Sequence, residues 1–272
     1  MTDLYKGDCL KTEDGVIYIA TISGGKDSVT MCDLLLKNGY PVDYIIFIDT
    51  LQEHNEMYKY INKVNVYFKL RYGKKITVLK PKTTFEDWCF GEVTRGDKKG
   101  VIWGIPTLDT PCYWRREAKV VPMDRFIQSL KSSQVHLYIG YTLGENRSVN
   151  NDKTKTHSYP LRDIFHMTEE RCKEYLIAQE MENPLYRHFN RTGCAMCPYQ
   201  SDQSFYALWK SYPKVWNYMR DVESKLNGSL NDRWFTNYRT CEDMEKLFKQ
   251  KDKQGSLFDF SDEPLKDCFC KI

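Results

Sequence analysis

The stretch that decides the fold is Val16-Ile-Tyr-Ile-Ala-Thr-Ile22 followed by Ser23-Gly24-Gly25-Lys26-Asp27-Ser28. The β-branched apolar run predicts a buried strand, the paired glycines predict a tight turn, and the apolar spacing over Val29–Leu36 predicts a helix. Paired glycines let backbone N–H groups turn inward, and a helix that begins there adds the positive end of its dipole. The segment therefore predicts a phosphate site.

Two other interpretations of this loop are weaker. A Walker loop requires Gly-x4-Gly-Lys-Ser/Thr, but Ala20 stands where the first glycine is needed and Asp27 where the magnesium-binding hydroxyl is needed. An ordinary turn, with Asp27 and Ser28 as helix caps, would also contain Ser-Gly-Gly. The strand before the loop and the helix after it favour the phosphate site.

Charge and cysteine content limit the classes of protein to which this chain can belong. The chain has 272 residues, with 40 Lys and Arg against 37 Asp and Glu, and its formal net charge of +3 neither demands nor excludes nucleic acid. No apolar run has the length of a signal peptide or a membrane span, so we expect a cytoplasmic protein with no membrane partner; a homo-oligomer is compatible with the sequence. Ten cysteines here favour reduced thiols or metal ligands over a disulfide framework. Four are expected to be small buried hydrophobes: Cys9, Cys32, Cys89 and Cys172.

Apolar strand patterns alternate with helical patterns through the first part of the chain. The strand patterns cover Val16–Ile22, Tyr44–Ile48, Ile76–Leu79 and Val135–Ile139, and the helical patterns cover Val29–Leu36, Glu53–Leu70 and Pro122–Leu130. This alternation predicts an α/β fold, a parallel twisted sheet with helices on both faces. Ligands of such sheets bind beyond the carboxyl ends of the strands, where Ser23–Ser28, Asp49-Thr50 and Gly140–Arg147 would gather. Thr83–Asp109 is expected to be an irregular insertion over this face.

The pattern becomes helical after Pro160. Thr168 opens a helix with capping-box spacing, and Ser204–Leu226 is a second helical stretch interrupted near Pro213. We therefore predict a nucleotide-binding domain over residues 1–165 and a helical C-terminal region over residues 166–272, which carries Cys194 and Cys197. Aromatic side chains at helical spacing in this region are expected to be core rather than stacking platforms for bases.

The chain resembles the PP-loop ATP pyrophosphatases of the adenine nucleotide α-hydrolase-like superfamily, and within it the phosphoadenosine phosphosulfate reductase-like branch. The segments that carry the resemblance are Ser23–Ser28, Phe47-Ile-Asp49-Thr50, Thr110–Pro122, Gly140–Arg147, Tyr159–Leu161, Asn183–Tyr186 and Gly193–Pro198. Thr142 stands where the branch has the first arginine of its fourth segment, which leaves that contact open. The resemblance implies a Rossmann-like fold and cleavage of ATP between its α and β phosphates.

Predicted roles follow for individual residues. Lys26 and Asp27 are the catalytic candidates, Lys26 as a charge on the departing pyrophosphate and Asp27 as a ligand of Mg²⁺ or, alternatively, only a helix cap. The predicted nucleotide-binding set is Ser23, Gly24, Gly25, Lys26, Asp27, Ser28, Asp49, Thr50 and Arg147. Three cations on about one helical turn suit a substrate phosphate or nucleic acid, although a solvated helix face is an equal alternative: Arg115, Arg116 and Lys119.

Cys194-x-x-Cys197-Pro198 has several interpretations: a redox dithiol, half of a zinc site, ligands of an iron–sulfur cluster, or a buried thiol pair without metal. The resemblance implies that Cys112 joins the pair, and three thiolates suit a [4Fe–4S] cluster with one open iron. Zinc is less favoured because it needs a fourth ligand. Cys241 or a terminal cysteine would close the cluster instead.

These features predict an ATP-dependent sulfurtransferase, which adenylates an acceptor, releases pyrophosphate and inserts sulfur. The acceptor would be a nucleic-acid base or backbone, or a nucleotide, and sulfur would come from a donor protein or sulfide. The first alternative is a thiol-dependent reductase of phosphoadenylyl sulfate or adenylyl sulfate, although its Glu-Cys-Gly-x-His motif is missing from this chain. The second is a non-catalytic module that binds nucleotide or nucleic acid.

Overall fold

The computed structural model describes residues 13–107, 112–131, 134–235 and 239–254. Five parallel strands form one sheet in the order β3-β2-β1-β4-β5. They are β1 Val16–Ile22, β2 Tyr44–Ile48, β3 Ile76–Leu79, β4 Gln134–Tyr138 and β5 Lys155–Ser158. The first four lie where the apolar runs predict them, to within one residue.

Strand β5 was not predicted, and its sequence explains why. Lys155-Thr-His-Ser158 carries no apolar run, and all four residues are half-buried at the edge of the sheet. Its side chains are held from β4, where the His136 ring bonds to Thr156 Oγ1 at 2.9 Å and to Ser158 Oγ at 2.8 Å. Contacts with β4 therefore stabilise a strand that no apolar pattern in the sequence predicts.

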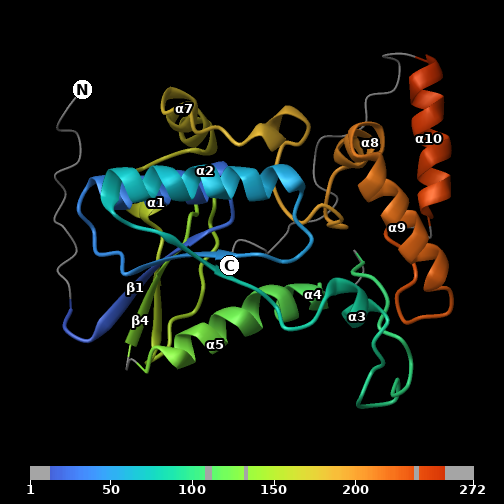
Figure 1. Cartoon of the computed structure of the whole chain (residues 1–272), viewed down its shortest axis with the longest axis horizontal. Helices are drawn as coiled ribbons and strands as arrows, with labels where there is room; N and C mark the ends of the chain where they lie inside the picture. The colour runs from blue at the N-terminus through green and yellow to red at the C-terminus, as the bar shows by residue number, and fades with distance from the viewer. Residues whose placement is uncertain (1–12, 108–111, 132–133, 236–238, 255–272) are drawn as a thin grey trace.

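Helices cover both faces of the sheet, as predicted (Figure 1). The alternation of side chains along β1 divides the core: Ala20 and Ile22 belong to the cluster that contains α1 (Lys26–Lys37) and α2 (Asn55–Tyr72). Ile19 points the other way and packs with Met123 of α5 (Val121–Ser129). A parallel sheet between two helical layers results, with its central strands buried and its edge strands partly exposed.

Shorter elements connect these layers. They are α3 Phe85–Cys89, α4 Tyr113–Arg115, a π-helix over Arg116–Val120, α6 Pro160–Asp163 and a 3₁₀ turn over Pro184–Arg187. The predicted irregular insertion contains α3, which Thr84 caps by accepting from Asp87 N–H at 3.0 Å, and an isolated bridge between Glu92 and Ile102. The Pro122–Leu130 prediction began too late, because the helical backbone already starts at Tyr113.

The helical region consists of α7 Glu169–Ala178, α8 Asp202–Ser211, α9 Pro213–Lys225 and α10 Cys241–Gln254. Thr168 caps α7 by accepting from Arg171 N–H at 3.3 Å, as the capping spacing predicts. Helix α7 lies against α1, and Thr30 Oγ1 donates to the Cys172 carbonyl at 3.2 Å. The predicted boundary at residue 165 stays a prediction.

The described aromatic residues of α8, α9 and the segment after them are buried in the core or pack against it, as expected. Phe205, Trp216 and Trp234 are fully buried, and Trp216 packs against Phe248 of α10. Within the described part of the chain, no helix is both long and apolar enough to cross a membrane.

Candidate functional site

The loop between β1 and α1 is a glycine turn that its own side chains and the helical region hold in place. Gly25 is the N-cap of α1 and offers no side chain to the first turn, and Gly24 has a positive φ of 77°. The loop serines brace the turn: Ser23 N–H donates to Ser28 Oγ at 3.0 Å, and Ser28 Oγ donates to the Gly25 carbonyl at 3.1 Å. The Gly24 carbonyl accepts from Asn183 Nδ2 at 2.8 Å. The helical region therefore helps to hold the loop.

Gly24→Ala is expected to lower the free energy of unfolding by about 2–5 kcal/mol, because a Cβ at Gly24 would overlap Sδ of Met57 and the positive φ is strained for alanine. Urea denaturation measures this loss. Gly39→Ala is the matched control, since Gly39 has a φ of 73° and open space around it. Equal losses in the two variants would contradict a role for the Met57 contact.

Lys26 is held in place by the helical region. Its Nζ lies 2.8 Å from Glu169 Oε2 and 5.4 Å from the centroid of the Tyr186 ring. The backbone N–H of Lys26 donates to Tyr186 Oη at 2.9 Å. Burial alone would lower the pKa of Lys26, but Tyr186, Asp27 and Glu169 outweigh burial and raise that pKa. Lys26 is therefore a fixed positive charge at the start of α1.

Glu169→Gln is expected to tighten ATP binding about two- to fivefold, because a bound phosphate must compete with the Glu169 carboxylate for Lys26 and a half-exposed ion pair is worth about 0.5–1 kcal/mol. Isothermal titration calorimetry with Mg²⁺-ATP measures the change. Glu170→Gln removes the same charge from the neighbouring exposed position and serves as the control. Weaker binding by Glu169→Gln would instead show that this carboxylate assists the nucleotide.

A pocket of about 370 Å³ opens beside the loop. Of the predicted nucleotide-binding residues, those that line it are Ser23, Gly25, Lys26, Asp27, Ser28 and Arg147. Asp27 is buried in the first turn of α1, which it does not cap. Gly140 passes so close to the backbone of Ser28 that a Cβ there would lie 3.1 Å from its Cα. The ends of β1 and β4 therefore meet at this pocket.

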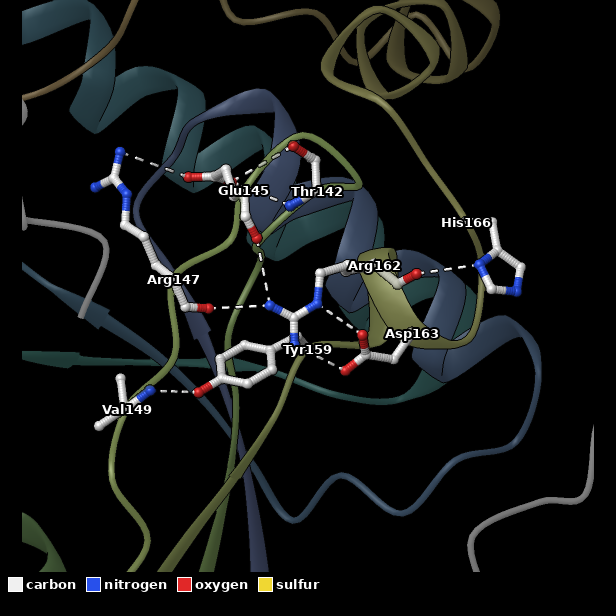
Figure 2. A network of polar contacts seen from close by, with 8 residues as sticks. All are labelled: Thr142, Glu145, Arg147, Val149, Tyr159, Arg162, Asp163 and His166. Carbon is white, nitrogen blue, oxygen red and sulfur yellow. Dashed lines mark hydrogen bonds and ion pairs between the residues drawn. The ribbon is translucent and has the colours of Figure 1, made fainter.

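The loop after β4 is organised around Arg162, which the sequence did not single out (Figure 2). Arg162 Nη1 donates to the carbonyls of Glu145 at 3.3 Å and Arg147 at 3.0 Å, and its guanidinium stacks 4.4 Å from the Tyr159 ring centroid. Thr142, which replaces the family arginine, is buried and donates its N–H to Glu145 Oε2 at 3.0 Å. Arg147 lies 4.0 Å from Glu145 Oε1, at the pocket wall.

Asp49 and Thr50 take other positions. Asp49 Oδ1 accepts from Tyr58 Oη at 2.9 Å, and its Oδ2 lies 3.2 Å from Lys80 Nζ. Thr50 Oγ1 donates to Glu53 Oε1 at 2.7 Å. Neither is among the described residues that line the larger pocket, and their contact with the sugar or base of a nucleotide stays a prediction.

The Cys-x-x-Cys segment docks on the turn after β2. Ala195 N–H donates to the Gln52 carbonyl at 2.7 Å, and Cys194 Sγ donates to Thr50 Oγ1 at 3.4 Å. Cys194 and Cys197 line the 370 Å³ pocket and also a second, apolar pocket of about 30 Å³, where Cys112 joins them. Burial raises the pKa of the Cys194 thiol to about 12. The three predicted thiols thus share the smaller pocket, and two of them also line the larger pocket beside the loop.

The donor set of the smaller pocket fits an iron–sulfur cluster by its chemistry. Three thiols suit iron, and Trp114 Nε1 and Arg115 Nε are buried without a hydrogen-bond partner among the described residues, as donors to sulfide would be. No group of three or more His, Cys, Asp or Glu side chains within the described ranges is arranged to hold a metal ion. The thiols would therefore have to turn toward a common point.

The described residues offer this pocket no fourth cysteine. Cys241, predicted as an alternative ligand, is fully buried in α10 and lines neither pocket. Cys32, Cys89 and Cys172 are buried, as predicted. The remaining cysteines, Cys9, Cys268 and Cys270, lie outside the described residues.

The three predicted cations do not act as one patch. Lys119 lines both pockets, Arg115 lines the smaller one, and Arg116 is exposed. The π-helix turn over Arg116–Val120 shifts the helical register between them. Lys119 is therefore the cation of this group that lies between the phosphate loop and the thiols.

A parallel α/β sheet with a glycine-rich loop between its first strand and first helix is the architecture that the sequence predicted. Residues 17–200 match the phosphoadenosine phosphosulfate reductase domain, and the chain belongs to that family. The expected resemblance is confirmed.

Similar sequences and structures extend this comparison. Two uncharacterized proteins of Methanocaldococcus jannaschii are 29% identical over 233 residues and 25% identical over 249 residues, covering 79% and 86% of this chain. These are 44% and 56% of the two relatives, so the chain spans about half their length.

Two solved structures that match this chain are less similar to it in sequence. A phosphoadenylyl-sulfate reductase from Candida auris, in a phosphate complex, is 19% identical with a TM-score of 0.46 over 67% of this chain and 82% of that one. The U34-tRNA thiolase NcsA from Methanococcus maripaludis, with its [4Fe-4S] cluster, is 17% identical with a TM-score of 0.40 over 89% and 83%.

Proposed function

We propose that the chain is an ATP-dependent sulfurtransferase that adenylates an acceptor oxygen and replaces it with sulfur. One observation carries the proposal: the phosphate loop with Lys26 and the thiols of Cys194 and Cys197 face the same pocket. An enzyme that only hydrolysed ATP would have no use for thiols there. Family membership supports a nucleotide substrate.

Adenylation uses the phosphate loop. The acceptor oxygen attacks the α-phosphorus, the bond from that phosphorus to the bridging oxygen breaks, and pyrophosphate leaves with the electron pair. The Lys26 ammonium and the positive end of the α1 dipole stabilise the charge that develops on pyrophosphate. Asp27 would hold Mg²⁺ among the phosphate oxygens, and Arg147 lines the same pocket.

Sulfur transfer completes the reaction without an external oxidant or reductant when sulfide is the donor. The sulfur attacks the activated carbon, the carbon–oxygen bond breaks, and AMP leaves with the oxygen. Cys112, Cys194 and Cys197 would hold a [4Fe–4S] cluster, which when bound supplies an iron that presents sulfide. Lys119, between the two pockets, attracts the anionic sulfur and the AMP phosphate.

The acceptor in this proposal is a nucleic acid or a nucleotide. Arg115 and Lys119 line the smaller pocket and Arg116 is exposed next to Arg115 in the sequence, and a phosphate backbone requires such positive charge. The proposal holds for a monomer and for a homo-oligomer.

The test incubates anaerobic protein with ATP, Mg²⁺, ³⁵S-sulfide and separate pools of bulk tRNA and DNA. Label incorporated into one pool, with AMP and pyrophosphate in equal amounts, is the expected result, and Lys26→Ala is the inactive control. Thiol-dependent sulfite release from adenylyl sulfate or its 3′-phosphate at enzyme-like rates would replace this proposal with a reductase. ATP binding without turnover in every pool would favour the non-catalytic module.

A further inference from the structure

Between α3 and α4 the chain doubles back on itself and forms a finger, residues 91–103, that extends away from the sheet beneath α3 (Figure 1). Backbone hydrogen bonds join its two sides. Val93 N–H donates to the Val101 carbonyl at 2.8 Å, and Gly100 N–H donates to the Val93 carbonyl at 2.9 Å. The finger is therefore a paired structure with a defined tip, not an open loop.

The base of the finger is anchored in the helical region. Ile105 N–H donates to the Asn231 carbonyl at 2.8 Å, and Leu230 N–H donates to the Ile102 carbonyl at 2.8 Å. Gly104 has a φ of 80°, and a Cβ there would lie only 1.9 Å from the Asn231 carbonyl oxygen. The base cannot shift without breaking these contacts, so the tip projects from a rigid support.

The tip of the finger is cationic and solvated. Arg95, Lys98 and Lys99 are exposed, and the side chain of none of them has a hydrogen bond or an ion pair with another described residue. Asp97 lies among them in the sequence and leaves the tip with a net positive charge, while Glu92 lies nearer the base, in the isolated bridge. An anionic partner would balance this charge, and a nucleic-acid backbone is such a partner.

A row of aromatic rings connects the finger to the smaller pocket. The Trp103 ring stacks on that of Trp88 in α3 at a centroid distance of 6.2 Å and an interplanar angle of 11°, and Trp88 lies 5.8 Å from Trp114, which lines the pocket. Tyr113 lies 5.7 Å from Trp103 and is 44% exposed. Trp114 is buried as a core ring would be, whereas Tyr113 keeps nearly half of its surface in solvent.

We propose that the three cations of the tip and Tyr113 form a binding surface for single-stranded nucleic acid, with phosphates on the cations and an unpaired base stacked on Tyr113. Bases of any sequence stack on aromatic side chains, whereas a duplex hides the faces of its bases in its own stack. Because the row of rings ends at Trp114, a strand on this surface leads to the smaller pocket. This inference rests on the proposed function in taking a nucleic acid as the acceptor, and its test needs neither ATP nor sulfur.

The test measures the fluorescence anisotropy of labelled oligonucleotides on addition of the full chain, over a range of KCl concentrations. The probes are oligouridylate, oligothymidylate, and the duplex of oligothymidylate with oligodeoxyadenylate. Wild type should bind a single strand about tenfold more tightly than the duplex, because stacking is available only to unpaired bases. The single strand that binds more tightly then indicates whether the acceptor is RNA or DNA.

Replacing Arg95, Lys98 and Lys99 together by alanine should weaken single-strand binding about tenfold. It should also lower the slope of log affinity against log salt concentration by about 2, since each phosphate contact on a single strand contributes about 0.7. The matched control removes the same charge where α1, α2 and α5 end and the chain enters the next strand, by replacing three exposed lysines with alanine: Lys37, Lys69 and Lys131. Equal losses in the two triple variants would reduce the effect to net charge and overturn the site.

Tyr113→Leu should weaken single-strand binding about five- to a hundredfold and leave the salt slope unchanged, because it removes a stacking ring and no charge. Tyr113→Phe keeps the ring and its packing against Trp103, so it should bind as wild type does. The pair of variants separates loss of stacking from loss of the tyrosine hydroxyl. Binding by Tyr113→Leu that equals wild type would overturn the role of this ring.

The remaining outcomes separate this inference from the proposed function. Binding of a single strand that depends on the tip and on Tyr113, without sulfur incorporation in any pool, supports the surface and favours the non-catalytic module. Sulfur transfer to a nucleotide by a protein that binds no oligonucleotide overturns the surface and leaves sulfur transfer intact. Equal affinity of wild type for single strand and duplex overturns the inference, whatever the ATP-binding result.

Discussion

Lys26→Ala is expected to bind Mg²⁺-ATP about ten- to a hundredfold more weakly than wild type, since a charge-assisted hydrogen bond to phosphate is worth about 1.5–3 kcal/mol. The Glu169 carboxylate is expected to increase this loss of ATP affinity. Glu169 pairs with Lys26 at 2.8 Å, so removing the lysine leaves its carboxylate facing the phosphates. Adenylation should fall further than binding does, because the lysine charge also follows the departing pyrophosphate.

Isothermal titration calorimetry of three variants tests whether the loss of ATP affinity comes from the missing Lys26 charge. Lys37→Ala is the matched control, because Lys37 ends the same helix, is exposed and lies over the Tyr175 ring rather than the pocket. The double variant Lys26→Ala with Glu169→Gln should recover part of the lost affinity by removing the repulsive carboxylate. Equal ATP affinity in wild type and Lys26→Ala would refute the assignment of the loop.

The first strand, loop and helix could be predicted because their signal is local. Val16–Ile22 is apolar throughout, and the two glycines of the loop have a conformational meaning in any context. The bounds of α1 could not be predicted to the residue. It begins at Lys26, three residues before the apolar pattern of Val29–Leu36, since Gly25 takes the N-cap position and polar residues fill the first turn.

The residues that complete the site lie far away in the sequence and carry no local signal. Asn183 bonds to the loop backbone at Gly24, and Tyr186 accepts from the Lys26 N–H, across some 160 positions. The sequence marked Asn183–Tyr186 as a family segment but did not indicate what its side chains contact. Arg162 was missed because it acts on backbone carbonyls, and a lone arginine after a Pro-Leu pair resembles any surface residue.

The sequence and the family resemblance predicted which cysteines lie together, but not how they are arranged. Spacing indicates that Cys194 and Cys197 are neighbours in space, whereas the place of Cys112 beside them depends on the tertiary packing of the N-cap of α4. The two buried N–H donors of α4 were unforeseeable, because burial of a single atom follows from packing and not from sequence pattern.

Single replacement of Cys112, Cys194 or Cys197 by alanine is expected to remove most of the bound iron and all detectable sulfur transfer. A cluster held by three thiolates has no spare ligand, and within the described residues Cys241 is too deeply buried in α10 to substitute. ATP affinity should stay within about twofold of wild type, because the phosphate loop is braced by its own serines, Asn183 and Tyr186. Iron analysis, the visible spectrum and calorimetry on the same preparation measure the three quantities.

Cys172→Ala is the control for this series, since Cys172 is a fully buried thiol of α7 that lines neither pocket. It should lose stability and keep its iron, which separates loss of a ligand from general damage. Stoichiometric zinc without iron after anaerobic reconstitution would contradict the cluster and require a fourth ligand. Of the histidines, His188 is nearest to the pair in sequence, but its ring packs against Phe189 and Tyr212. Glu53 and His54 line the larger pocket together with Cys194 and Cys197, so a zinc-bound protein would recruit one of these two residues, and replacing that residue would then release the metal.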